Sequence, residues 1–194
     1  MKKNILKRNK GFTLIEMMIA IAIFLIVITI GVGALLNASA VHNKTKGMRS
    51  VLDSMTFTME EMSRNLRTGH EYHCGGSGSG PLSCPGGGTA ISFKSSQGTV
   101  SDEIWQYSIC SIGTGNGICK STGGGSLLPL TPPEVNIDSS SRFYVFGAET
   151  INDTVQPYVI LKISGTINYH NTSTQFNLRT AVSQRAIDIP PIAP

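Results

Sequence analysis

Charged residues are scarce in this chain, and the few that it has are unevenly distributed. Asp, Glu, Lys and Arg make up 14% of its 194 residues, whereas an average soluble domain has roughly 25%. Five of the 16 basic residues stand among the first ten positions, where no acidic residue occurs. The remaining chain holds 11 basic and 12 acidic residues and is nearly neutral. This distribution argues against a basic nucleic-acid-binding domain, whose charge gathers on the folded surface.

The sequence also lacks the common catalytic and phosphate-binding motifs. No serine stands in a G-x-S-x-G nucleophile elbow. The glycine-rich stretch 113–117 has neither the lysine nor the spacing of a phosphate-binding loop. Glu60 and Glu61 are neighbours on a predicted helix and point to different faces, so they do not form a catalytic carboxylate pair. We therefore expect that the chain is not an enzyme and has no cofactor.

A long stretch without any charge follows the basic start of the chain. It comprises the 20 consecutive residues from Met17 to Leu36. As a helix rising about 1.5 Å per residue, this stretch spans roughly 30 Å, the hydrocarbon thickness of a bilayer. Basic residues before a span stay in the cytoplasm, and Lys44, Lys46 and Arg49 after it are fewer and farther away. We therefore predict a single span with a cytoplasmic N-terminus and an external C-terminus.

Glu16 stands at the edge of this apolar stretch. An unpaired carboxylate inside a membrane span costs on the order of 2–3 kcal/mol, although placement in the interface beside the basic start lowers that cost. No Lys or Arg lies between Glu16 and Lys44. The remaining cation is an α-amino group, which a cut just before Phe12 would create.

Residues 10–20 read Lys-Gly-Phe-Thr-Leu-Ile-Glu-Met-Met-Ile-Ala. This segment resembles the processing and methylation motif of type IV prepilins and pseudopilins. The resemblance implies cleavage after Gly11 and N-methylation of Phe12 by a prepilin peptidase/methyltransferase. It also implies that Glu16 neutralises the amino terminus of a neighbouring subunit. Many pilins carry a helix-kinking proline where this chain has Gly31 and Gly33, and two glycines would let the helix bend in a filament.

The resemblance implies a structural subunit of a type IV pilus or a type II secretion-like filament. Its partners would be other pilin or pseudopilin subunits, the peptidase and an inner-membrane assembly platform, and contact with nucleic acid stays open. Its location would be the inner membrane and then an extracellular or periplasmic filament. More distantly, the chain resembles PilW-type minor pilins or J-class minor pseudopilins. The sequence leaves the choice between a pilus, a secretion and a competence system open.

Two other classes of protein remain as alternatives. The first is a soluble secreted binding protein, because residues 38–40 read Ala-Ser-Ala, which is a candidate signal cleavage site. Its mature chain would begin at Val41 and would lack the anchor. The second is a membrane-anchored adhesion or DNA-uptake module that never polymerises. Such a module would keep the anchor and would not depend on Glu16.

The hydrophobic pattern predicts four segments. Residues 1–11 form a cleaved basic leader, 12–36 a transmembrane or filament-core helix, 37–68 an amphipathic continuation of that helix, and 69–194 an external β-rich head. A stripe spaced by four and three residues marks the face of the second helical half that packs on the head; its members are Met48, Leu52, Met55, Met59, Met62 and Leu66. Gly69 is expected to end the helix.

The head reads as an antiparallel sheet packed against the long helix, so the fold class is α+β. Five segments have strand composition: 90–94, 103–110, 142–146, 157–168 and 175–182. A loop at 171–174 would join the last two strands, and the proline-rich tail 189–194 would be extended. The aromatic residues of these strands are expected in the core: Trp105, Tyr107, Phe143, Tyr144 and Phe146.

Four cysteines are expected to form two disulfides, because the head faces an oxidising compartment. Of three connectivities, the local pairs Cys74–Cys84 and Cys110–Cys119 are favoured, and they would hold glycine-rich loops. The two earlier cysteines, with His70 and His73, also have the residue types of a zinc site, but they contain no C-x-x-C pair. We therefore expect no metal site there. A looser calcium site near either of two later aspartates stays open: Asp138 and Asp153.

Overall fold

The computed structural model describes residues 11–76, 80–97, 103–149, 155–169 and 172–185. The leader at 1–10, the proline-rich tail and the calcium candidate Asp153 lie outside the described residues. The chain divides into two compact units, Met1–Thr45 and Lys46–Pro194, which are described separately. The first unit contributes the beginning of one helix, and the second contains the rest of this helix and the strands of the described residues.

Helix α1 runs without interruption from Leu14 to Thr68, over 55 residues. It passes through Gly31 and Gly33 as regular helix. Its apolar first half is long and hydrophobic enough to cross a membrane. The prediction of one helix with an apolar half and an amphipathic half is therefore confirmed.

The face of α1 that packs in the second unit differs slightly from the predicted stripe. Met55, Met62 and Leu66 are buried as expected, but Leu52 is 42% exposed and Val51 is buried in its place. A straight helix has 3.6 residues per turn and therefore drifts away from a 3.5-residue repeat. The prediction for Leu52 was wrong because it extended a strict heptad backwards over several turns.

The strands form two antiparallel sheets, whereas the sequence predicted one. The first sheet has the order β1-β3-β4-β5-β6, with bounds His70–Cys74, Ala90–Ser95, Glu103–Ile112, Gly115–Thr122 and Leu128–Pro129. The second sheet has the order β10-β9-β8-β2, and β7 also pairs with β9; the bounds are Thr172–Ser183, Tyr158–Tyr169, Arg142–Phe146, Cys84–Gly88 and Val135–Ile137. The α+β class is confirmed, and all five predicted strands are present.

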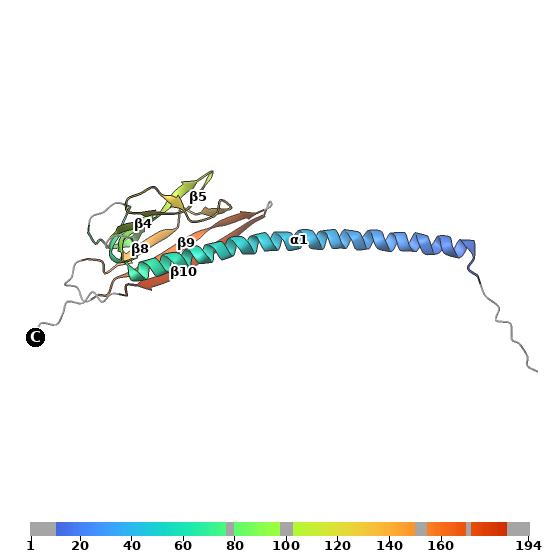
Figure 1. Ribbon diagram of the computed structural model, residues 1–194, viewed down its shortest axis with the longest axis horizontal. Coiled ribbons are helices and arrows are strands. Elements are labelled where there is room, and N and C mark those ends of the chain that lie inside the picture. Colours follow the sequence, from blue (N-terminus) through green and yellow to red (C-terminus); the bar gives the residue numbers. More distant parts are fainter. Residues whose placement is uncertain (1–10, 77–79, 98–102, 150–154, 170–171, 186–194) are drawn as a thin grey trace, which may run out of the picture. The chain divides into compact units, whose positions relative to one another are not determined.

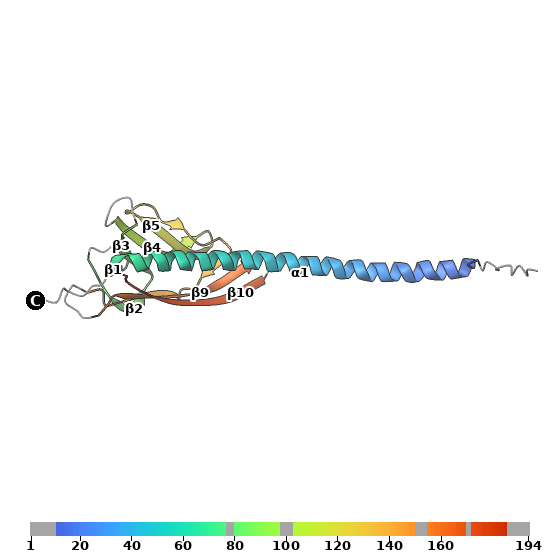
Figure 2. The ribbon, with the colours of Figure 1, turned by 60° about the horizontal axis from the view of Figure 1, so that its bottom comes forward.

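Helix α1 lies against both sheets within the second unit (Figure 1). In Figure 2, β3, β4 and β5 lie on one side of the α1 ribbon, and β9 and β10 lie on the other. One hydrophobic cluster joins side chains from all three parts, among them Met62 of α1, Tyr107 of the first sheet and Leu161 of the second, each with 0% exposure. The second half of α1 therefore packs into one hydrophobic core that it shares with both sheets.

The two disulfides have different structural roles. Cys74 in β1 is bonded to Cys84 in β2, with Cα atoms 5.7 Å apart. Because β1 and β2 belong to different sheets, this bond links the sheets covalently. Cys110 and Cys119 are bonded across the neighbouring strands β4 and β5. The Cys110–Cys119 bond holds a hairpin and not the expected loop, because all but two of the residues that it encloses belong to β4 and β5. The described residues enclosed by the Cys74–Cys84 bond form no strand.

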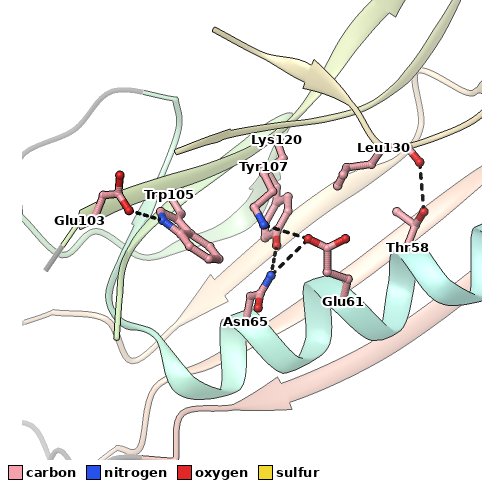
Figure 3. Close-up of polar contacts among 8 residues, drawn as sticks. All are labelled: Thr58, Glu61, Asn65, Glu103, Trp105, Tyr107, Lys120 and Leu130. Atoms are coloured by element: carbon pink, nitrogen blue, oxygen red, sulfur yellow. Dashed lines mark hydrogen bonds and ion pairs between the residues drawn. The ribbon is translucent and has the colours of Figure 1, made fainter. Parts of the chain in front are cut away.

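A polar cluster fixes α1 on the first sheet (Figure 3). The Asn65 side-chain amide donates a hydrogen bond of 2.7 Å to the Tyr107 hydroxyl oxygen, and both side chains are buried. The Lys120 ammonium lies 2.8 Å from a carboxylate oxygen of Glu61 and 4.1 Å from the centroid of the Trp105 ring. Burial, with a smaller effect of the Glu61 charge, raises the pKa of Tyr107, so its hydroxyl stays neutral.

The C-terminal carbonyls of α1 are paired by a residue of β1 and by residues just beyond the ends of β3 and β10. The Tyr72 hydroxyl donates to the Leu66 carbonyl, the Ser96 hydroxyl to the Thr68 carbonyl, and the Arg185 backbone N–H to the Arg67 carbonyl. Since the last four carbonyls of a helix have no partner inside the helix, such contacts stabilise its end. They also fix where the chain turns from helix into β1.

Gly69 follows the helix as predicted, but for a different reason. The structure places it against the buried Phe93 ring, and a Cβ atom at position 69 would collide with that ring and lie 3.2 Å from the Asn65 carbonyl oxygen. Its backbone is not in the left-handed region that a glycine helix stop commonly uses. Close packing, and not backbone conformation, therefore requires glycine here.

Replacing Tyr107 by phenylalanine should destabilise the head. Tyr107→Phe leaves the buried Asn65 amide with only its long hydrogen bond of 3.5 Å to the Glu61 carboxylate. Loss of one side-chain hydrogen bond typically costs about 0.5–1.5 kcal/mol. Thermal unfolding of the purified protein, followed by circular dichroism, should show a lower melting temperature. The matched control is Tyr144→Phe on the partly exposed outer face of β8, which should melt within about a degree of the wild type, as surface changes usually do. Equal melting of both variants would contradict a stabilising role for the Asn65–Tyr107 bond.

Gly69→Ala should destabilise the protein by about 1–3 kcal/mol, as expected for an added methyl group in a packed core. Gly86→Ala is the control, because a Cβ atom at position 86 has no atom within 4 Å. Chemical denaturation of both variants measures the difference. A Gly69→Ala protein as stable as the control would show that the Phe93 ring can move aside freely.

Candidate processing and assembly site

The N-terminus of α1 is defined by a side-chain cap. The Thr13 hydroxyl accepts a hydrogen bond of 3.3 Å from the Glu16 backbone N–H, and the Thr13 carbonyl accepts one of 3.2 Å from the Met17 N–H. Thr13 is thus the residue before the first helical turn, and Glu16 is the third residue within it. The pattern Thr-x-x-Glu is that of a capping box. This cap was not predicted from the sequence, although the Thr-x-x-Glu spacing alone is sufficient to find it.

The two residues assigned to processing precede the helix. Gly11 and Phe12 have no regular secondary structure and are exposed, and the Phe12 side chain is 79% exposed. A Cβ atom at position 11 would have no atom within 4 Å. The peptide bond between them is therefore accessible, as proteolytic sites generally are.

Glu16 projects from the first turn of α1 and is exposed. It makes no ion pair with any other residue in the described ranges. A carboxylate in the first helical turn interacts favourably with the positive end of the helix dipole. Since the adjoining side chains are apolar, Glu16 places a negative charge beside a hydrophobic surface.

The apolar half of α1 is not covered by any other part of the described structure. Its large side chains are exposed throughout, and no residue of the apolar window is buried. Exposed hydrophobic surface of this extent is a mark of contact with a membrane or with protein partners. This surface follows directly after Glu16 in the sequence.

The zinc candidates do not come together as a site. Cys74 and Cys84 are joined in a disulfide, and a ring nitrogen of His73 lies 2.7 Å from the Gly80 carbonyl oxygen. Within the described ranges, no group of three or more His, Cys, Asp or Glu side chains is placed to hold a metal ion. Asp138 contributes its backbone carbonyl to a turn with the Ser141 N–H.

The aromatic residues expected in the core have two different locations. Tyr107 and Phe143 are fully buried, and Trp105 is partly buried against Lys120. Tyr144 and Phe146 instead lie on the outer face of the second sheet, where they are partly exposed. Alternation along β8 explains this difference, because neighbouring residues of a strand point to opposite faces.

A concave surface lies between α1 and β10. It encloses about 460 Å³, and its lining includes Arg64, Arg67, Thr180 and Arg185. Glu60 also lines it, whereas Glu61 points to the first sheet and pairs with Lys120. The two glutamates therefore lie on different faces, in agreement with the argument against a carboxylate pair.

Comparison with known proteins identifies the N-terminal segment. Residues 6–32 match a family described as the prokaryotic N-terminal methylation motif. No curated protein and no solved structure matches the chain. The matched residues contain the capped helix start, Glu16 and most of the apolar surface of α1. The chain therefore carries a prokaryotic N-terminal methylation motif over residues 6–32.

Proposed function

We propose that this chain is a structural subunit that enters a type IV pilus or a type II secretion-like filament after cleavage between Gly11 and Phe12. Residues 12–36 then serve first as a membrane anchor and later as the filament core, while the external head forms the surface. One observation carries the proposal: an accessible peptide bond immediately precedes a capped helix whose apolar half is uncovered.

The capped start of α1 supports the position of the cut. Because Thr13 ends the helix on its N-terminal side, cleavage before Phe12 leaves α1 intact. The new amino terminus is a cation close to the positive end of the helix dipole, where a positive charge is unfavourable. A carboxylate from outside the subunit therefore stabilises it.

Glu16 is suited to supply that carboxylate to a neighbouring subunit. Its side chain is exposed and has no ion-pair partner in the described part of the chain. In the membrane, the unpaired carboxylate is costly, by about 2–3 kcal/mol at a central position. Assembly of helices side by side places the amino terminus of one subunit near Glu16 of the next, so that two unfavourable charges become one pair.

The intact mass and the N-terminal sequence of the membrane-extracted protein test the processing step. We expect a chain that begins at Phe12 and carries one additional methyl group on its amino nitrogen. Co-expression with an inactive prepilin peptidase should instead leave the chain starting at Met1. A mature protein that begins at Val41 would overturn the proposal and favour a secreted soluble domain.

Glu16→Gln should be inserted and cleaved normally but should enter filaments poorly. The variant keeps the shape of the side chain and removes the charge that pairs with the amino terminus. A loss of about 2 kcal/mol corresponds to roughly 30-fold less incorporation at equilibrium. Quantitative immunoblotting of sheared filaments against the membrane pool measures the effect.

Glu60→Gln is the matched control, because Glu60 is an exposed glutamate on the same helix but belongs to the second unit. It should enter filaments like the wild type. If Glu16→Gln does the same, Glu16 has no charge-pairing role in assembly. Such a result would favour an anchored surface module that does not polymerise.

A further inference from the structure

The register of the second sheet creates a row of cations on its outer face. Lys162 in β9 lies directly opposite Arg142 in β8 and directly opposite Arg179 in β10. Directly opposed residues of antiparallel strands project from the same face of the sheet. These three residues, here called the basic row, therefore stand side by side across three neighbouring strands.

The basic row points away from the hydrophobic core. Leu161 and Ile163, the neighbours of Lys162 along β9, have 0% exposure and pack in the core shared with α1. Because side chains alternate along a strand, Lys162 projects to the opposite face. Arg142 and Lys162 are partly exposed, and Arg179 is exposed.

The described part of the fold does not neutralise this row. Lys162 and Arg179 make no hydrogen bond or ion pair with any described residue. Arg142 donates only to backbone carbonyls, those of Ser139 and Ser141. Like charges directly opposite one another destabilise a sheet. An anion bound from outside would relieve this repulsion.

Side chains that recognise hydroxyl groups border the row on one side. Asn177 of β10 lies opposite Ser164 of β9, and Gln175 lies opposite Thr166 one step further along. On the other side of the row, Tyr144 lies opposite Ile160. Amide and hydroxyl side chains both donate and accept hydrogen bonds, and guanidinium groups bind carboxylates in a bidentate manner.

We propose that this outer face binds an acidic polysaccharide whose carboxylates lie on the basic row and whose hydroxyl groups lie on the amide side. A single-stranded nucleic acid fits less well, because such ligands need aromatic faces for successive bases. The two rings at the end of this face, Phe146 and Tyr158, are stacked on each other with centroids 4.9 Å apart. The proposal does not depend on polymerisation, since the row is complete within one subunit.

Binding of the detergent-solubilised full-length protein to immobilised polygalacturonate, a linear polymer of uronic acid, tests the proposal. The double variant Lys162→Gln/Arg179→Gln should bind at least about tenfold more weakly than the wild type, because two charge-assisted contacts are lost. Its affinity should also depend less on salt concentration. The control Arg64→Gln/Arg67→Gln removes the same charge from the exposed side of α1 and should bind within about twofold of the wild type.

Thermal melting without ligand shows whether the double variant is folded. It should melt at the same temperature as the wild type or higher, because the substitution removes like-charge repulsion. If the test and control variants lose the same affinity for polygalacturonate, binding depends only on net charge, and the proposal is overturned. Absence of measurable binding, or displacement of polygalacturonate by a much more tightly bound oligothymidylate, would overturn it as well; the second result would assign the face to nucleic acid.

Discussion

The structure depends on the contact between one face of α1 and two sheets at once. Met55, Met62 and Leu66 are almost completely buried and belong to the same cluster as residues of both sheets. Each sheet has an apolar face that must be shielded from water, and α1 packs against both of these faces. Burial of large apolar side chains contributes about 1.5–3 kcal/mol each, so the removal of this helical face would affect both sheets together. The Cys74–Cys84 bond adds a covalent link between them.

Methionines dominate this helical face, and they specify orientation poorly because their side chains are flexible. The polar contacts with the first sheet complement them. The Asn65–Tyr107 hydrogen bond is buried, and the Glu61–Lys120 pair is largely shielded, with side-chain exposures of 23% and 18%. Buried polar groups must be paired with correct geometry. The flexible methionines could adapt to a rotation of α1 about its axis, but such a rotation would break these two polar pairs. The pairs therefore favour one orientation of the helix on the first sheet.

Features that depend on local sequence were predictable. The apolar stretch, the five strands rich in β-branched and aromatic residues, and the methylation motif follow from neighbouring residues alone. The strands β2 and β5 were missed because residues 84–88 and 115–117 are mostly glycine or asparagine, and glycine has little intrinsic strand preference. β2 forms because it pairs with β8, and β5 forms because it pairs with β4 and β6. Such pairing between distant segments is not visible in a single sequence.

The same distinction separates the proposed processing site from the proposed binding surface. The first could be proposed from the sequence alone, because Gly11, Phe12 and Glu16 lie within six residues. The basic row could not, because Arg142, Lys162 and Arg179 are far apart in the chain and meet only through strand register. Both surfaces are compatible with one subunit: α1 covers the inner face of the second sheet, and the row lies on the outer face. Because α1 does not cover the outer face, a ligand can bind there without any change in the residues that pack the helix against this sheet.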